Sequence, residues 1–345
     1  MYSGNRDIQQ KQRNMAKVDI HYFNEALACA TRKGFERDEI LKKLSIKIKP
    51  NQQRVDGEEM SRLVQYVWAT LNDEFLGCTS KPCKVGIFPF MARHVLHYKN
   101  LEKMLEQGIS FYNLITEDMK MKLVRRGEFA ELEFFFAQPE KDPNHFFLEF
   151  WLIIWHRFSS WLIDVKIPLS QVCFTHEKPV HWKEAKLLFT CRHSFNRPVV
   201  KLCFHAKYLT LPCVRRGEEL TRFLRDSPAD LITIPGSEHS FKAKIKAILI
   251  NDESDTLYCP SFETLALNLN MSAQTLRRRL KVEGTSYPMI KDEVRRDLAI
   301  EYLLKANDSI AVIANVLGFS EPRSFTRAFK QWTGISPSKY ASSKQ

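Results

Sequence analysis

The sequence lacks several features that carry enzymatic or metal chemistry. Its eight cysteines are scattered, with no Cys-x-x-Cys pair, and the closest two, Cys78 and Cys83, have no matching pair downstream. It has no glycine-rich phosphate loop and no nucleophile elbow, which argues against nucleotide-dependent and hydrolase activities. A chain of 345 residues needs no disulfide staples, so we expect reduced, mostly buried thiols, as in cytoplasmic proteins.

Long apolar runs are also scarce. The most apolar segment, residues 146–163, is interrupted by Glu149, His156 and Arg157. Its unbroken part is far shorter than the roughly 20 residues that span a bilayer. We interpret it as a buried amphipathic helix of a soluble, cytoplasmic protein without membrane contact. Residues 1–17 are polar with no apolar core, which is typical of a disordered tail and not of a signal peptide.

Basic residues outnumber acidic ones, with 52 Lys and Arg against 40 Asp and Glu. This excess suits a polyanionic partner such as nucleic acid or an acidic membrane surface, but it fixes neither fold nor function. The length leaves room for about two domains, each with its own core.

Hydrophobic periodicity divides the chain into a mixed region and a helical one. Helical spacing covers residues 18–76 and 101–114, with a break at residues 84–90. A hairpin is predicted around Arg126-Gly127, between apolar alternation on either side. Three further strand candidates are residues 170–175, 187–189 and 199–204. The turn signal Pro235-Gly236 separates these strands from a purely helical remainder.

Two short helices joined by a tight turn are predicted in residues 261–283. Ser261 is the expected N-cap of the first helix and Ser272 that of the second. Leu276 and Leu280 lie four residues apart and face the core. The outer face of the second helix then carries Arg277, Arg278 and Lys281, with Arg279 at its flank. Such a pair is the helix-turn-helix unit, whose second helix enters the major groove of DNA.

The same pattern recurs near the C-terminus, where Phe325 and Phe329 enclose Arg327. Ser309 is placed to cap the preceding helix, and Gly318 suits the left-handed turn after it. The helical residues 288–305 between the two units would span roughly 27 Å. With the helix radii added, that length sets two recognition helices about 34 Å apart, one turn of DNA. The arginines are therefore interpreted as facing DNA and not as a merely solvated surface.

The C-terminal part of the sequence resembles that of a protein family, the AraC/XylS transcription regulators. The resemblance covers about residues 241–340, and its most specific part is residues 310–340, IAVIANVLGFSEPRSFTRAFKQWTGISPSKY. It implies two helix-turn-helix units on one linker helix, binding two successive major-groove segments. We predict that Ala314, Gly318 and Phe319 act through packing and turn geometry, without touching bases.

The resemblance places the base-reading positions on Gln274, Arg277 and Arg278 in the first unit. In the second unit it places them on Arg323, Thr326 and Arg327, after Pro322 where many relatives carry a polar residue. Arg can contact guanine bidentately, Gln can pair with adenine, and the Thr methyl can touch thymine. Lys281 and Lys330 complete the expected DNA-binding set.

The upstream region resembles the sensor domain of the ornithine-utilisation-regulator branch, with its arabinose-binding-type N-terminal domain. The motifs, in the expected order, are residues 86–89 (GIFP), 101–112, 150–162 and 174–179 (FTHEKP). The resemblance implies an effector-binding α+β domain that also governs dimerisation, without naming the effector. It favours activation over repression and a dimer over a monomer, with RNA polymerase as a further partner.

We therefore expect a disordered tail over residues 1–17, an α+β effector-binding domain over 18–229, a linker over 230–237 and an all-α DNA-binding domain over 238–345. Over two hundred residues remain outside the DNA-binding domain, enough for a largely apolar effector pocket. The aromatic helix within residues 146–163, with its polar insertions Glu149, His156 and Arg157, is either a wall of that pocket or ordinary core and surface. No effector-binding residue can be chosen.

Three alternatives stay open. The first domain could bind only a protein partner. Cys213, in Pro212-Cys213-Val214-Arg215, resembles the nucleophile of DNA-repair alkyltransferases, but Val214 stands where their activating His would be. We expect Cys213 to be a buried thiol at a strand end, and the protein to have no catalytic residues. The ten histidines form no compact four-ligand pattern, so neither a metal nor another cofactor is expected.

Overall fold

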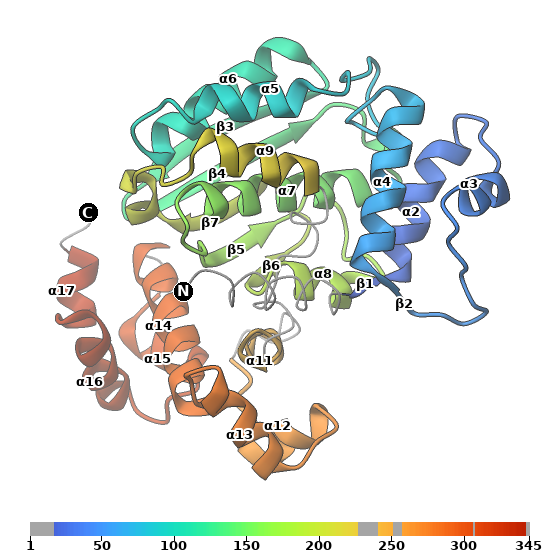
Figure 1. Cartoon of the computed structure of the whole chain (residues 1–345). Coiled ribbons are helices and arrows are strands. Elements are labelled where there is room, and N and C mark those ends of the chain that lie inside the picture. The colour runs from blue at the N-terminus through green and yellow to red at the C-terminus, as the bar shows by residue number, and fades with distance from the viewer. Residues whose placement is uncertain (1–16, 227–240, 251–256, 306–307, 343–345) are drawn as a thin grey trace.

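The computed structural model describes residues 17–226, 241–250, 257–305 and 308–342 (Figure 1). Three hydrophobic cores organise these residues. The largest core lies within residues 18–223, the second within residues 245–294, and the third within residues 299–340. The predicted turn at Pro235-Gly236 falls outside the described residues.

The regular structure of residues 17–71 consists of three helices and one small two-stranded ribbon. Val18 pairs with Val55 in an antiparallel ladder of two short strands, so the expectation of continuous helical structure over residues 18–76 was wrong at this point. The ladder brings two helices together, whose buried faces meet in the largest core. The elements are β1 (Lys17–Asp19), α2 (Ile20–Thr31), α3 (Arg37–Lys43), β2 (Arg54–Asp56) and α4 (Gly57–Leu71).

A five-stranded sheet forms the middle of the first region, with the strand order β3-β4-β7-β5-β6. The predicted hairpin is confirmed: β3 and β4 pair antiparallel from Met119↔Phe136 to Arg126↔Phe129. Gly127 forms its turn with a φ of 59°, a conformation that costs glycine little. The strands are β3 (Met119–Arg126), β4 (Phe129–Phe136), β5 (Leu169–Cys173), β6 (Arg192–Ser194) and β7 (Val200–His205).

Two sequence predictions failed beside this sheet. Residues 187–189 were expected to form a strand, but they lie at the end of helix α8 (Trp182–Leu188) and just after it. A short apolar run does not distinguish a strand from a buried helix. Residues 84–90 were expected to break the helical rhythm, yet α5 (Ile87–Val95) begins among them after Gly86. Its Pro89 sits in the first turn, where the missing N–H has no partner to lose.

Helices lie over one side of the sheet (Figure 1). Helix α7 (Phe146–Leu162) is buried at every residue except His156 and Trp161. It packs closely on α6 (Leu101–Ile115), because a Cβ built on Gly108 would lie 2.9 Å from the ring of Trp155. No described helix is long and apolar enough to cross a membrane. Two 3-10 turns, η1 (Pro139–Lys141) and η2 (Ala206–Thr210), and helix α9 (Gly217–Asp226) complete the region.

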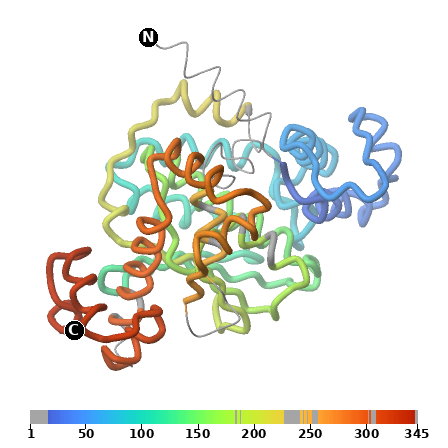
Figure 2. The backbone as a smooth tube through the Cα atoms, turned by 90° about the horizontal axis from the view of Figure 1, so that it is seen from below, coloured from blue at the N-terminus to red at the C-terminus, as the bar shows by residue number. Residues whose placement is uncertain are grey.

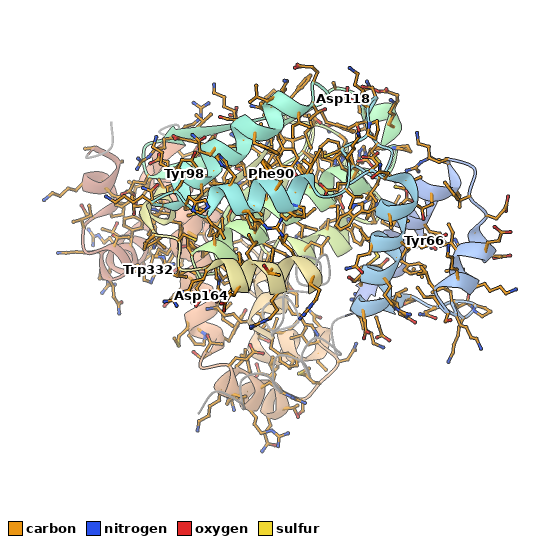
Figure 3. The ribbon with its side chains drawn as sticks, turned by 45° about the horizontal axis from the view of Figure 1, so that its top comes forward. Tyr66, Phe90, Tyr98, Asp118, Asp164 and Trp332 are labelled. Atoms are coloured by element: carbon orange, nitrogen blue, oxygen red, sulfur yellow. The ribbon has the colours of Figure 1, made fainter. Side chains whose placement is uncertain are left out.

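Helix α5 carries an apolar side chain on the outer surface of the domain. Phe90 is 64% exposed, and its ring stacks on Phe111 of α6 at 5.8 Å between centroids (Figure 3). Phe88, on the inner side of the same helix, packs against Phe158 of α7. The helix therefore has a buried face toward α7 and a partly exposed one toward solvent.

The second region is entirely helical where it is described. Its helices are α11 (Phe241–Leu249), α12 (Phe262–Asn268), α13 (Ala273–Val282), α14 (Tyr287–Lys305), α15 (Ile310–Val316), α16 (Pro322–Thr333) and α17 (Pro337–Ser342). The second core joins α11, α12, α13 and the first half of α14, and the third joins the rest of α14 with α15, α16 and α17. Helix α14 therefore links two separate small units.

The helical region lies against the sheet-containing region (Figure 2). Arg192 of β6 donates a hydrogen bond from Nη1 to the hydroxyl of Tyr302 on α14, at 2.9 Å. The Lys186 ammonium of α8 donates to the backbone oxygen of Ile250, and the Tyr340 hydroxyl donates to the carboxylate of Glu128. The contacts thus reach both units of the helical region.

Candidate DNA-binding interface and effector cavity

The first helix-turn-helix unit consists of α12 and α13, each capped as predicted. Ser261 Oγ accepts from the Thr264 N–H at 3.1 Å, and Ser272 Oγ accepts from the Thr275 N–H at 3.2 Å. These bonds satisfy N–H groups that would otherwise lack a partner at the helix start. Leu276 and Leu280 are buried in the second core, as their four-residue spacing predicted.

The second unit consists of α15 and α16 and repeats this construction. Ser309 Oγ accepts from the Val312 N–H at 3.3 Å. Gly318 turns the chain with a φ of 70°, which confirms the predicted left-handed position, and Ala314 is buried beneath it. Pro322 stands in the first turn of α16, where proline is favourable.

The eight predicted DNA-binding residues fall on two helix faces with the same spacing. Seven are exposed, and Thr326 is half-buried. On α13 they are Gln274, Arg277, Arg278 and Lys281, and on α16 they are Arg323, Thr326, Arg327 and Lys330. In each helix the four positions are i, i+3, i+4 and i+7, which is one helical stripe.

Most of these cations are unengaged within the described part of the chain. Arg278, Arg323 and Arg327 form no ion pair there, so their guanidinium groups are available to an anion. Arg277 differs, because its guanidinium lies 5.3 Å from the centroid of the Phe262 ring on α12. Arg279, predicted at the flank, lies over the Phe241 ring at 6.0 Å.

Arg295 of α14 holds the turn of the second unit, a role that the sequence pattern did not reveal. Its Nε and Nη2 donate to the backbone oxygens of Leu317 and Gly318, both at 3.1 Å. Its guanidinium also lies 4.4 Å from the centroid of the Phe319 ring. One side chain therefore satisfies two carbonyls at the end of α15 and packs on the adjacent aromatic ring.

Replacing Arg295 by Leu should lower the free energy of unfolding of the second unit by about 1–2 kcal/mol, since two charge-assisted hydrogen bonds are lost. The measurement is chemical denaturation followed by near-ultraviolet signals, because Trp332 lies in this unit. Arg296→Leu on the same helix is the matched control, since Arg296 pairs with its neighbour Asp297. Equal losses for the two variants would contradict the role given to Arg295.

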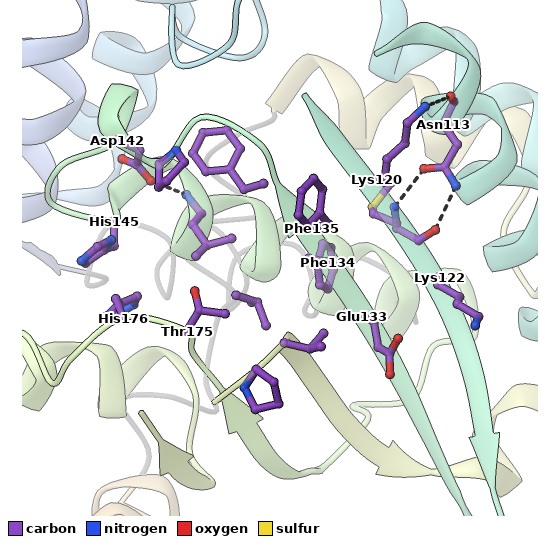
Figure 4. Close-up of a pocket in the computed structure, with 17 residues that line it drawn as sticks. Asn113, Lys120, Lys122, Glu133, Phe134, Phe135, Asp142, His145, Thr175 and His176 are labelled. Carbon is purple, nitrogen blue, oxygen red and sulfur yellow. Dashed lines mark hydrogen bonds between the residues drawn. The ribbon is translucent and has the colours of Figure 1, made fainter. Parts of the chain in front are cut away.

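The sheet-containing region holds a cavity of about 810 Å³ at one end of the sheet (Figure 4). Its middle is apolar and its two ends are polar. The apolar lining is Met121, Phe134, Phe135, Phe136, Pro139, Leu148, Pro198, Val199 and Val200, and the polar lining is Asn113, Lys120, Lys122, Glu133, Asp142, His145, Thr175 and His176. Size and lining are those of a small-molecule site.

Two stacked imidazoles form one end of this cavity. The rings of His145 and His176 are 3.6 Å apart and nearly parallel, at 5°. Burial lowers the pKa of His145 to about 4 and also lowers the pKa of His176, so both rings are neutral at pH 7. His176 Nδ1 contacts the Glu177 carbonyl at 2.7 Å, and within the described residues its buried Nε2 has no partner. A ligand could use that nitrogen.

The carboxylate of Asp142 lies at the same end but is already engaged. It accepts from the Phe147 N–H at 3.0 Å and the Leu148 N–H at 2.9 Å, which caps the start of α7. Burial nevertheless raises the pKa of Asp142 to about 6. Its role is therefore to fix the helix that supplies Leu148 to the cavity.

The opposite end is built on β3. Lys120 donates to the Asn113 carbonyl at 2.7 Å and pairs with Glu117 at 2.8 Å. The Asn113 side chain is held by both backbone groups of Met121 at 2.9 Å. Lys122 lies two residues beyond Lys120 along β3. It is exposed and has no partner within the described residues, so it is a free cation at this end (Figure 4).

The polar residues of the α7 region do not line this cavity. Glu149 is buried, where it accepts from the Tyr22 hydroxyl at 2.8 Å and contacts His181 at 3.2 Å. His156 contacts the Ile167 carbonyl at 2.7 Å, and Arg157 is 1% exposed. The structure supports core for Glu149 and Arg157 and places His156 at the wall of a different cavity, of about 380 Å³; none of the three is a wall of the cavity beside β3. The helix reaches the cavity through Leu148 instead.

The remaining candidate sites gain no support from the geometry. Cys213 was expected to be buried at a strand end, but it is half-buried and outside any strand. Burial raises the pKa of Cys213, which disfavours the thiolate that a nucleophile needs. Six of the other seven cysteines are buried, as predicted. Within the described ranges, no three His, Cys, Asp or Glu side chains are grouped to hold a metal ion.

Comparison with known proteins accounts for both regions. Residues 34–213 match the arabinose-binding domain of AraC transcription regulators, and residues 265–343 match a helix-turn-helix domain. The chain is 26% identical over 246 residues to the ornithine utilization regulator of Pseudomonas aeruginosa, covering 71% of this chain and 72% of that protein. It is 42% identical over 84 residues to the transcriptional regulator VqsM of the same species, covering 24% and 26%.

Among solved structures, the transcriptional regulator CdpR of Pseudomonas aeruginosa aligns with 88% of this chain and 96% of its own. The identity is 18% and the TM-score 0.31, too low to bear on the arrangement of the domains. The match to the arabinose-binding domain spans more than half of the 345 residues. The protein therefore belongs to the AraC family and is a DNA-binding transcription regulator with an arabinose-binding-type N-terminal domain.

Proposed function

We propose that the protein is an effector-responsive activator that reads two successive major-groove segments with α13 and α16. The observation that carries this proposal is the equally spaced stripe on the two helices, in which seven of the eight residues are exposed. Arg323 and Arg327 on α16 match Gln274 and Arg278 on α13 in position. Two such stripes on one connecting helix suit a bipartite site on one face of DNA.

The same proposal assigns the regions. Residues 18–229 form the effector-binding domain, residues 230–237 the linker, and residues 238–345 the DNA-binding domain. The separate cores support this division, because the first ends at Phe223 and the second begins beyond Phe241. We further propose that the regulator acts in the cytoplasm, contacts RNA polymerase and works as a homodimer.

The effector site that we propose is the large cavity beside β3 and β4. Its apolar middle would receive the body of a ligand, while His176 and Lys122 at opposite ends would hold its polar groups. Regulation requires that this ligand favour one arrangement of the two domains over another. The contacts Arg192–Tyr302, Lys186–Ile250 and Tyr340–Glu128 are described links through which such a preference would be transmitted.

A thermal-shift screen of the full chain against metabolites should identify a stabilising ligand. A ligand at a hundred times its Kd adds about 2.7 kcal/mol to the free energy of unfolding. L-ornithine belongs in the panel, because the related Pseudomonas aeruginosa protein is named for ornithine utilization. Val199→Trp should abolish the shift, since Val199 lines the cavity, whereas Val180→Trp, at a fully exposed valine, should retain it.

A reporter gene under the protein's own target promoter tests the regulatory part. The effector should change transcription in the presence of the intact chain and not with Val199→Trp. If deletion of residues 18–229 left basal and induced transcription unchanged, the sensor assignment would be wrong. If no metabolite shifted the melting temperature but a protein partner did, the alternative of a protein-binding first domain would replace it.

A further inference from the structure

A second, smaller cavity lies elsewhere in the N-terminal domain. It has a volume of about 230 Å³, is open on one side, and is lined by α4, the start of α5, α7, α9 and the segment between α4 and α5. It shares no lining residue with the proposed effector cavity. Leu224 of α9 forms one side of it, and α9 is the last described helix before the DNA-binding region.

Three aromatic side chains line this cavity: Trp68, Phe88 and Trp151. The Trp68 indole is fixed, because its Nε1 donates to the Glu74 carbonyl at 3.1 Å. Phe88 is held against Phe158 of α7. Aromatic faces carry negative potential and attract ammonium and guanidinium groups, most strongly where water is excluded.

A buried carboxylate adjoins these rings. Glu74 lines the cavity and is 6% exposed. Its oxygens accept from the N–H groups of Gly86 and Phe88, both at 2.8 Å. Asp73 beside it is also buried and likewise accepts from backbone N–H groups. Within the described residues neither carboxylate has a cationic partner, although a buried charge without one is costly.

The lining residue Trp151 also carries a donor that is unpartnered within the described residues. Trp151 is 2% exposed, and its Nε1 has no hydrogen-bond partner in the described part of the chain. Buried indole N–H groups normally find an acceptor. An indole donates only, so its partner must be an acceptor, such as an oxygen of a bound molecule.

We propose that this cavity binds a small organic cation, with an ammonium or guanidinium group between the aromatic rings and Glu74 and an oxygen acceptor at Trp151. The volume is below the 300 Å³ or so at which drug-sized sites begin, so the ligand has few heavy atoms. A bound cation would contact Leu224 and would thereby change the position of α9.

The test is calorimetric titration of the full chain with three probes of similar length: 4-aminobutan-1-ol, butylamine and butane-1,4-diol. The aminoalcohol should bind saturably, butylamine more weakly, and the neutral diol at least about tenfold more weakly than the aminoalcohol. Equal binding of the diol and the aminoalcohol, or no binding of either amine, would overturn the proposal.

Two variants separate the parts of the site. Trp151→Phe keeps the ring and removes the N–H, so it should reduce the affinity for the aminoalcohol to that for butylamine and leave butylamine unchanged. Glu74→Gln should remove the binding of both amines, with the melting temperature as a check of folding. Val199→Trp, in the larger cavity, should leave the affinities for both amines unchanged. The result therefore distinguishes a failure of this proposal from a failure of the effector proposal.

The pH profile gives a readout that needs no change of Glu74. Burial, together with the neighbouring Asp73, raises the pKa of Glu74 to about 7 against the two backbone hydrogen bonds, which lower it. The Cys83 thiol and the Tyr112 hydroxyl also face this carboxyl group. A cation needs the ionised carboxylate, so the affinity for butylamine should fall about tenfold for each pH unit below about 7. A flat profile between pH 6 and 8 would contradict the assignment of Glu74.

Discussion

Gly318→Val should abolish the contribution of the second helix-turn-helix unit to DNA binding. Gly318 adopts a φ of 70°, which costs other residues about 1–3 kcal/mol, with β-branched side chains the least tolerated. A Cβ at this position would lie 3.6 Å from the Leu257 carbonyl oxygen and 3.7 Å from Arg295. The two additional methyl groups of Val have little room beside those atoms. Footprinting should then show one protected segment where the wild type protects two.

A graded series distinguishes backbone strain from loss of space. Gly318→Ala adds only the Cβ, which meets its neighbours at ordinary contact distance, so its effect should be intermediate. Gly318→Asn should be the mildest, because Asn tolerates the left-handed region better than other residues. If Gly318→Val bound its operator with normal affinity, the role given to this turn would be wrong.

Replacing Arg278 and Arg327 together by Ala should give the largest loss of operator affinity among the substitutions of exposed residues. Each arginine that contacts a base bidentately contributes about 1–3 kcal/mol of discrimination. Because the helices that carry the two residues pack into separate cores, their effects should add, to about 2–6 kcal/mol. Each single variant should also relax the base preference at one position of the site.

Arg279→Ala is the matched control on the same helix, since Arg279 lies over Phe241 and outside the proposed stripe. It should leave base preference intact. Competition with random DNA separates the two possible origins of an effect, because a phosphate contact lowers specific and nonspecific affinity alike. Equal losses on operator and random DNA for Arg278→Ala would contradict base reading by that residue.

The DNA-binding region could be predicted from the sequence because its signals are local. N-caps such as Ser272, the turn glycine Gly318 and apolar pairs four residues apart all act within one or two helical turns. The hairpin before α7 was predictable for the same reason, since a turn and its flanking alternation are adjacent in the chain.

The proposed effector site could not be predicted in this way. Lys122, Leu148, Thr175 and Val199 come from four distant segments, and only the strand order β3-β4-β7-β5-β6 brings them to one end of the sheet. The polar residues that drew attention to the α7 region, Glu149 above all, are satisfied inside the core instead. The role of Arg295 could not be predicted from the sequence, because its partners are backbone carbonyls 22 and 23 positions away.

The near-complete burial of α7 has a consequence for how the chain folds as it is synthesised. Residues 146–162 leave the ribosome before β5, β7 and α9 exist, yet those elements supply part of their cover: Phe223 of α9 packs on Trp161 at 4.3 Å between centroids. Until about residue 226 has been made, this segment presents its aromatic surface to solvent and to other nascent chains. The N-terminal domain should therefore fold late and all at once, depend on holding chaperones during translation, and aggregate when truncated ahead of α9.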